Sequence, residues 1–174
     1  MDKIRTALEG ATSYLSRHPD EATYTDSVAI ATIVDGLRVS TTGPAGETVL
    51  TDMPASVGGT DGAHSPGWLL RAAEASCVAT FVSMRAAMLG HALDGLTVTV
   101  DSVSDDRGIL GMDANVPAGP LRGHISISIS AAGVETDELE RIARWGVDHC
   151  PVVDAVRRAV PMALDIDTEP SFPS

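Results

Sequence analysis

The spacing of apolar residues changes several times along the chain, and each change marks the boundary of a predicted element. Residues 3–17 carry one helical stripe, which consists of Ile4, Ala7, Leu8, Ala11, Tyr14 and Leu15. The "HPDE" that follows ends this helix at a proline. From residue 28 to residue 50, β-branched residues are interrupted by "DG" and "GPAG", which predicts three short strands joined by tight turns. We therefore expect an N-terminal helix followed by an antiparallel meander.

A glycine-rich stretch without periodicity, residues 55–67, predicts a loop before the longest helical pattern of the chain. Ser65 offers an N-cap oxygen, Pro66 suits the first helical position, and Gly90 marks the end of the helix. Between residues 68 and 89 the charged residues are Arg71, Glu74 and Arg85. Because nearly every face of this helix is apolar, we expect it to run through the middle of the fold.

The second half of the chain alternates apolar and polar residues in "LTVTVDSVS", "ILGMDANVP" and "GHISISIS". This pattern predicts a second antiparallel set of strands. "TDELERIARWGVDH" predicts a short amphipathic helix with a cap at Thr136, and another short helix begins at Pro151. "PMALDIDT" predicts a closing strand, and the last few residues, 169–174, are expected to fray.

Composition narrows the possible partners of this 174-residue chain. Its formal charge of −12 would repel phosphate backbones and anionic lipid surfaces, so we expect neither nucleic acid nor membrane partners. The N-terminus "MDKIRTALEG" lacks the apolar stretch of a signal peptide, and no later window holds about 18 unbroken apolar residues. These features predict a cytoplasmic protein, in which a cysteine pair more often serves catalysis, redox sensing or metal binding than structural cross-linking.

The two cysteines, Cys77 and Cys150, are the candidate reactive groups. Cys150 precedes Pro151 and so occupies a helix N-cap, where unpaired N–H groups and the helix dipole lower a thiol pKa. Local physics therefore predicts Cys150 as the more acidic thiol, whereas Cys77 lies too far along its helix for the dipole to help. Both could equally be small buried core residues. A metal site is not expected, because no CxxC occurs and the histidines lack i, i+4 spacing.

Two cysteine motifs carry a family resemblance that covers residues 28–167. In the long helix, "SPGWLLRAAEASC" matches a pattern of Asn or Ser, Pro, two residues, Leu, six residues, Ala or Ser, and Cys. Its matching positions here are Ser65, Pro66, Leu69, Ser76 and Cys77. A later "CPV" at Cys150 matches a second motif. The chain resembles the OsmC/Ohr family of organic hydroperoxide reductases and their OsmC-like relatives.

The resemblance implies an α+β fold of antiparallel sheets around a long central helix, built as an intertwined homodimer with active sites at the subunit interface. The OsmC-like domain would span residues 27–168, after an N-terminal helical segment, residues 1–26. Cys77 would attack an organic hydroperoxide and become a sulfenic acid, and Cys150 would then form an intramolecular disulfide with it. An external dithiol would reduce the disulfide, so the resemblance implies no metal and no bound cofactor.

Two residues that the family places beside the reactive cysteine are missing from their usual positions. The family's reductases carry a glutamate directly after the helix-opening proline, where this chain has Gly67, and an upstream arginine, of which residues 52–65 contain none. The candidate replacements are Arg38 on a predicted strand and Glu74, one helical turn before Cys77. A glutamate alone would suppress the Cys77 thiolate, so Arg38 or Arg71 would have to compensate.

Three functions remain open at this point. The first is a thiol-dependent peroxidase for organic hydroperoxides that acts in oxidative stress defence. The second is a non-catalytic dimer that binds a small apolar ligand or a protein partner, which the missing glutamate and arginine favour. The third is a redox sensor in which Cys150 is oxidised first.

Overall fold

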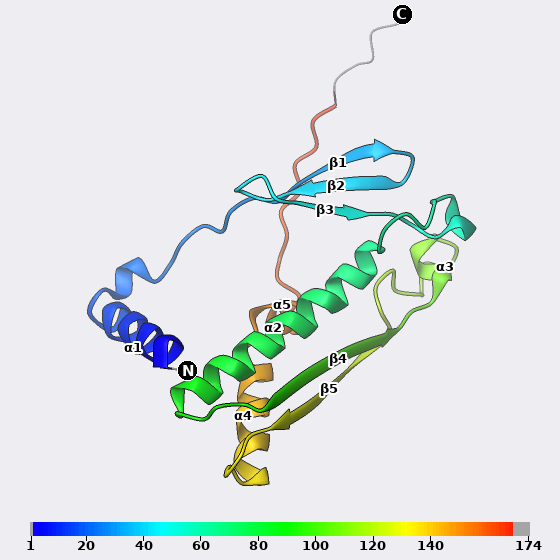
Figure 1. Cartoon of the computed structure of the whole chain (residues 1–174). Coiled ribbons are helices and arrows are strands. Elements are labelled where there is room, and N and C mark those ends of the chain that lie inside the picture. The colour runs from blue at the N-terminus through cyan, green and yellow to red at the C-terminus, as the bar shows by residue number, and fades with distance from the viewer. Residues whose placement is uncertain (1, 169–174) are drawn as a thin grey trace, which may run out of the picture.

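The computed structural model describes residues 2–168, which form two antiparallel sheets and five α-helices (Figure 1). The helices are α1 (Asp2–Arg17), α2 (Pro66–Met88), α3 (Asp106–Ile109), α4 (Thr136–Asp148) and α5 (Pro151–Arg158). The meander consists of β1 (Ile30–Asp35), β2 (Arg38–Thr42) and β3 (Thr48–Thr51), and the second sheet of β4 (Gly95–Val103) and β5 (Arg122–Ser130). Short 3-10 turns lie at Pro19–Glu21 and Ala55–Val57. The predicted α+β fold with antiparallel sheets and a long helix is confirmed.

Helix α2 is the element around which the core forms. It packs against α1, α4, α5 and β4, and its buried residues include Val78, Val82 and Ala86. The two-stranded sheet turns one apolar face toward these residues, because alternate positions such as Val98 and Ile127 are cross-strand partners on the same face. The core therefore lies between α2, the β4–β5 sheet and the two C-terminal helices.

The helix-start prediction for α2 is confirmed in detail. Ser65 is the N-cap, and its Oγ accepts a hydrogen bond from the Trp68 amide at 3.2 Å. Pro66 is the first helical residue, and Gly90 adopts φ +80° just after the helix. The expectation that the whole helix runs through the core is only partly met, since Ala73, Ser76 and Thr80 lie on an exposed stripe.

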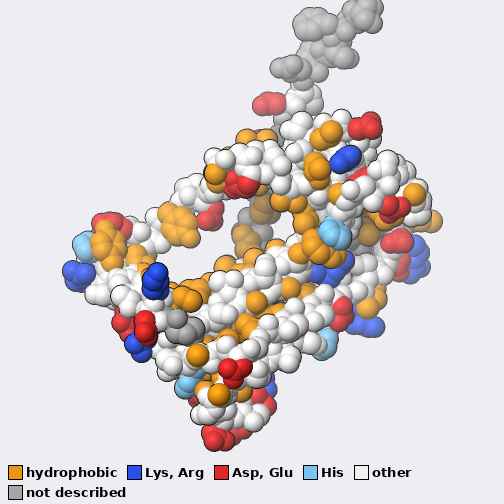
Figure 2. All heavy atoms as spheres, in the orientation of Figure 1, with side chains coloured by type: hydrophobic (Ala, Val, Ile, Leu, Met, Phe, Trp, Pro, Cys, Tyr) orange, Lys and Arg blue, Asp and Glu red, His pale blue; other side chains and the backbone are white. Residues whose placement is uncertain are grey.

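The β1–β3 meander stands apart from this core. Its strands make their extensive contacts with one another rather than with the helices of the described chain. Every residue of β1 is exposed, including Ile33 at 71%. Figure 2 shows an opening between α2 and the chain that leads from α1 to the meander. Within residues 2–168, no helix packs on this sheet as a layer, and β1 is left exposed.

Three predicted local features are wrong. "ILGMDANVP" is not a strand, because Asp105 caps the short helix α3 and Gly111 turns the chain at φ +64°. "PMALDIDT" forms no strand, and Leu164 is 79% exposed without a neighbouring strand among residues 2–168. Thr136 is the first residue of α4 rather than its cap, which is Glu135. The predicted fraying of residues 169–174 lies outside the described residues.

Candidate active site

The two cysteines, 73 positions apart, meet in the core. Cys77 lies on α2 and is half-buried, whereas Cys150 is completely buried at the N-cap of α5. Pro151 begins α5 directly after Cys150, and the buried Val153 holds this helix end in the same cluster as Val78 of α2. Cys77 packs against that cluster, and its thiol is close enough to Cys150 to raise the pKa of the Cys150 thiol. Both thiols are free in this structure.

Burial decides the ionisation of Cys150. Loss of solvent raises the pKa of the Cys150 thiol, and the neighbouring Cys77 thiol raises it further. The N–H groups of Val153 and Val152 at the start of α5 act in the opposite direction, although the sulfur makes no full capping hydrogen bond. The prediction that the helix N-terminus makes Cys150 acidic is therefore wrong, because burial outweighs the helix end.

His149, the neighbour of Cys150, packs against Trp145 of α4. Its ring stacks on Trp145 with centroids 3.9 Å apart, and its Nδ1 lies 2.9 Å from the Trp145 carbonyl oxygen. The Trp145 ring also carries the Arg85 guanidinium, 5.0 Å from the ring centroid. These contacts hold the end of α4 next to Cys150, and they engage the Nδ1 of His149.

Arg38 is the first predicted site residue that the protomer does not bring to the thiols. It opens β2 on the meander, which does not pack as a layer on α2. Its Nε is buried without a hydrogen-bond partner within residues 2–168, a situation that costs free energy unless a partner is supplied. Arg38 also forms no ion pair within that part of the chain.

Glu74 lies one helical turn before Cys77, as predicted, but it faces the β4–β5 sheet. It lines a cavity of about 150 Å³ together with Arg71 and Arg122, and Cys77 is not among the lining residues. Nη1 of Arg71 donates a hydrogen bond to Ser102 Oγ at 3.2 Å. Arg71 is therefore directed to β4, and the proposed compensation of Glu74 by Arg71 beside Cys77 is not observed.

Gly67, at the position of the family's glutamate, has room for a side chain. A Cβ added there would lie 3.9 Å from Arg71 Nη1 and from Ser65 Oγ. The glycine is thus not required by a close backbone contact. Glu74 does not take over that position, because it lies nearly two turns further along α2.

Asp52 is a site-supporting residue that sequence reasoning missed. It is 1% exposed at the end of β3, and it accepts hydrogen bonds from the Met53 and Gly62 amides and from the Thr60 hydroxyl. These bonds lower the pKa of Asp52 to about 2. The carboxylate thereby closes the glycine-rich loop that leads into α2. The sequence feature that could have identified Asp52 is an acidic residue placed before a glycine-rich loop. The backbone N–H groups of such a loop need a hydrogen-bond acceptor.

The described residues contain neither a membrane-spanning helix nor a metal cluster. Within residues 2–168, no helix is long and apolar enough to cross a bilayer. In the same part of the chain, no three His, Cys, Asp or Glu side chains gather as metal ligands would.

Comparison with known proteins places this geometry in context. Residues 59–165 match the family model described as OsmC-like protein, and no curated protein matches the sequence. Among solved structures, one described as an osmotic stress induced and detoxification response protein from Psychrobacter arcticus is 23% identical. It covers 77% of this chain and 90% of its own, with a TM-score of 0.60.

Two further structures extend the similarity of fold. An organic hydroperoxide resistance protein from Legionella pneumophila is 19% identical, covers 78% of this chain and 91% of its own, and has a TM-score of 0.54. An OsmC-like protein from Mycoplasma pneumoniae is 11% identical, covers 78% and 89%, and has a TM-score of 0.65. At these identities the solved structures establish a common fold.

Proposed function

Because the chain belongs to the OsmC-like protein family, we propose that it is a thiol-dependent peroxidase that reduces organic hydroperoxides. The observation that carries this proposal is the contact between the thiols of Cys77 and Cys150 inside the core. Several proteins of this fold are described as organic hydroperoxide resistance proteins. The proposed reaction needs both thiols close together. Cysteines that served only as small core residues would not need to lie next to each other.

The reaction begins at Cys77, the less buried thiol. Its thiolate attacks the terminal oxygen of the hydroperoxide, so that an S–O bond forms, the O–O bond breaks, and the departing alkoxide takes a proton to become an alcohol. Cys150 loses its proton and attacks the Cys77 sulfenic acid, which forms the disulfide and releases water. An external dithiol then reduces the disulfide and is itself oxidised. No metal or bound cofactor takes part.

Burial suits Cys150 to the second step. A thiol with a raised pKa stays protonated and unreactive toward peroxide until the sulfenic acid forms beside it. The same burial argues against a sensor in which Cys150 is oxidised first, because peroxide has no direct access to a fully buried sulfur.

The proposed enzyme is a homodimer, and the second subunit supplies the cation that Cys77 lacks. The exposed Ile33 and Val34 of the meander offer apolar surface for a second copy, and the exposed stripe of α2 consists of small residues that allow close approach. Arg38 lies on that meander with a buried, unsatisfied Nε. In the intertwined dimer, Arg38 of one subunit approaches Cys77 of the other, favours its thiolate and offsets Glu74.

The experiment measures consumption of cumene hydroperoxide by the full-length protein with dithiothreitol as reductant. The wild-type protein should turn over, Cys77→Ser should be inactive, and Cys150→Ser should accumulate a Cys77 sulfenic acid that dimedone traps. Arg38→Gln should lower kcat/KM by at least about tenfold, whereas Arg17→Gln on α1 serves as the exposed arginine control. Dimedone labelling of Cys150 in Cys77→Ser would instead favour the sensor.

A non-catalytic dimer that binds a small apolar ligand or a partner is the second candidate. It is favoured by the electrostatics around α2, where Arg71 is hydrogen-bonded to Ser102 and Glu74 forms no ion pair within residues 2–168. If both thiols remain free by mass spectrometry after peroxide treatment of the dimer, the peroxidase is rejected and this candidate stands.

A further inference from the structure

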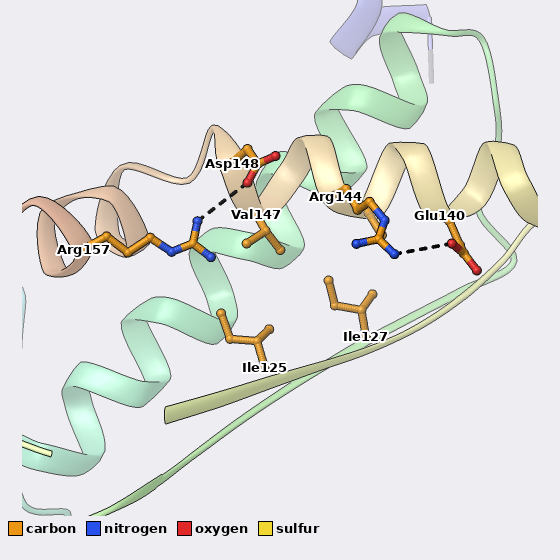
Figure 3. A pocket seen from close by; sticks show the side chains of 8 residues that line it. Ile125, Ile127, Glu140, Arg144, Val147, Asp148 and Arg157 are labelled. Atoms are coloured by element: carbon orange, nitrogen blue, oxygen red, sulfur yellow. Dashed lines mark ion pairs between the residues drawn. The ribbon is translucent and has the colours of Figure 1, made fainter. Parts of the chain in front are cut away.

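A groove of about 440 Å³ lies between β5 and helix α4. Its floor is apolar and consists of Ile125 and Ile127 of β5, with Val147 of α4 facing them (Figure 3). A second cavity of about 400 Å³ shares these three residues and Arg157, and its lining adds Val100, Val153 and Val156 together with Glu74 and His124. Cys77 and Cys150 line neither cavity. The two together form an elongated apolar trough of the size that small ligands occupy.

Two arginines from different helices reach over this trough. Arg144 extends from α4 and Arg157 from α5, and their guanidinium groups lie on either side of Val147 above the isoleucines (Figure 3). Arg144 is paired with Glu140 and Arg157 with Asp148, each at 3.6 Å. That separation is too long for a hydrogen bond, so neither guanidinium donates one to its carboxylate.

Neighbouring arginines on the same two helices behave differently. Arg141 donates hydrogen bonds from Nε and Nη2 to Glu138, with the Nε bond at 3.0 Å. Arg158 donates from Nε to Asp154 at 2.7 Å. On each helix, therefore, the arginine that points away from the trough is bound by a carboxylate, and the arginine that borders the trough keeps its N–H donors free.

Guanidinium groups with free N–H donors above an apolar floor would suit a ligand that has both an anionic group and an apolar part. A guanidinium binds carboxylate or sulfonate oxygens through two parallel N–H bonds, and exposed ion pairs at 3.6 Å contribute little that a ligand would have to replace. In the first cavity Glu140 and Asp148 balance the two arginines, whereas the second cavity adds the Glu74 carboxylate, in a chain whose overall charge is −12. The first cavity, which Glu74 does not line, is thus the part of the trough where this acidic protein can accept an anion.

We propose that the trough binds an amphipathic organic anion, with its carboxylate or sulfonate between Arg144 and Arg157. The alkyl chain of the ligand lies on Ile125 and Ile127 and extends toward Val153 and Val156. Neither cysteine lines this site, although Val153 belongs to the same core cluster as Cys150, and the proposed binding does not require peroxidase activity.

Isothermal titration calorimetry of the full-length protein with sodium octanoate tests the proposal. Octanoate should bind, whereas acetate, which lacks the chain, and octyltrimethylammonium, which reverses the charge, should bind at least about tenfold more weakly. Arg144→Gln and Arg157→Gln should each weaken octanoate binding by about tenfold. The matched controls Arg141→Gln and Arg158→Gln should change it by less than about twofold.

Several results would overturn the proposal. These are absence of octanoate binding, equal or tighter binding of the cationic ligand, or equal losses in the Arg144 and Arg141 variants when all variants unfold at the same temperature. The Cys77→Ser, Cys150→Ser double variant should bind octanoate as the wild type does, so a failed peroxidase assay leaves this test unaffected. Loss of binding in that double variant would show that the ligand occupies the thiol site instead.

Discussion

At the scale of single residues, the Asp52 carboxylate shows how one charge organises the entrance to the cysteine-bearing helix. Its Oδ2 accepts bonds from the Thr60 hydroxyl and the Gly62 amide, and Oδ1 accepts from the Met53 amide at 2.7 Å. The Asp52 amide in turn donates to the His64 carbonyl at 3.2 Å. These bonds close the loop one residue before the cap of α2, so the start of α2 depends on them.

We expect Asp52→Asn to destabilise the protein in a pH-dependent way. The pKa of Asp52 is lowered from 3.8 to about 2 in the folded state, so its charged form stabilises the fold above pH 4. That contribution disappears as the pH falls through 4 toward 2. The urea midpoint of the variant should lie below that of the wild type at pH 7, and the difference should shrink at pH 3. The exposed Asp26→Asn is the control, and a difference independent of pH would contradict the argument.

Residue-level predictions succeeded where local rules decide. Ser65 and Cys150 were identified as N-caps because proline at the first helical position is a local signal. The Cys150 pKa was mispredicted because its burial depends on Val78 and Val82, which the fold brings from a distant part of the chain. Asp52 was missed for the same reason, since its donors lie up to ten residues away.

At the scale of elements, the crossing of α2 and α4 holds the thiol-bearing part of the core together. Gly146 of α4 lies against Val82 of α2, and a Cβ added at Gly146 would lie 2.8 Å from the Val82 nitrogen and closer still to its Cγ2. Backbone atoms cannot move aside as a flexible side chain can. The absence of a side chain at Gly146 therefore sets the separation of the two helices.

Gly146→Ala should lower the free energy of unfolding by about 1–3 kcal/mol, because the added methyl group forces the helices apart. Chemical denaturation followed by circular dichroism measures the change. Gly10→Ala is the matched control, since a Cβ at Gly10 of helix α1 meets nothing within 4 Å, and it should leave stability unchanged or slightly raised. Equal stability of the Gly146 variant and the wild type would refute close packing at this crossing.

The alternation of apolar residues predicted β4 and β5 correctly because each strand finds the other within the chain. The same alternation failed for residues 109–117, where Gly108 lies so close to the Pro117 carbonyl that the segment folds back on itself. It also failed for residues 161–168, which have the pattern of a strand but no neighbour to pair with in the described protomer. Alternation shows which face of a segment could be buried. Whether the segment forms a strand depends on another strand lying beside it.

At the scale of the whole molecule, many large apolar side chains of the described residues are exposed. They include Ile33 and Val34 of β1, and Met162, Leu164 and Ile166 of the segment after α5. The family resemblance predicted an intertwined homodimer, and that prediction stands as part of the proposed function. The division into residues 1–26 and 27–168 likewise stays a prediction, and the family match to residues 59–165 lies inside the second part.

If two copies fold together, the temperature of unfolding must depend on protein concentration. The midpoint should rise as the concentration is raised a hundredfold, because association stabilises only the folded chains, and light scattering should give twice the chain mass. Ile33→Glu should shift the scattering mass toward one chain and reduce peroxidase activity with it. A midpoint that stays constant, together with the mass of one chain, would contradict the dimer.

The exposed segment after α5 contains a methionine whose oxidation can be measured. Met162 is 88% exposed, and a thioether so open to solvent takes up oxygen from peroxide to become a sulfoxide. If a second copy covers this segment, that sulfur is shielded, and sixteen mass units should appear at Met112, which is 71% exposed on the α3 loop, sooner than at Met162. The order in which these two methionines gain oxygen would thus map the buried surface without any engineered probe.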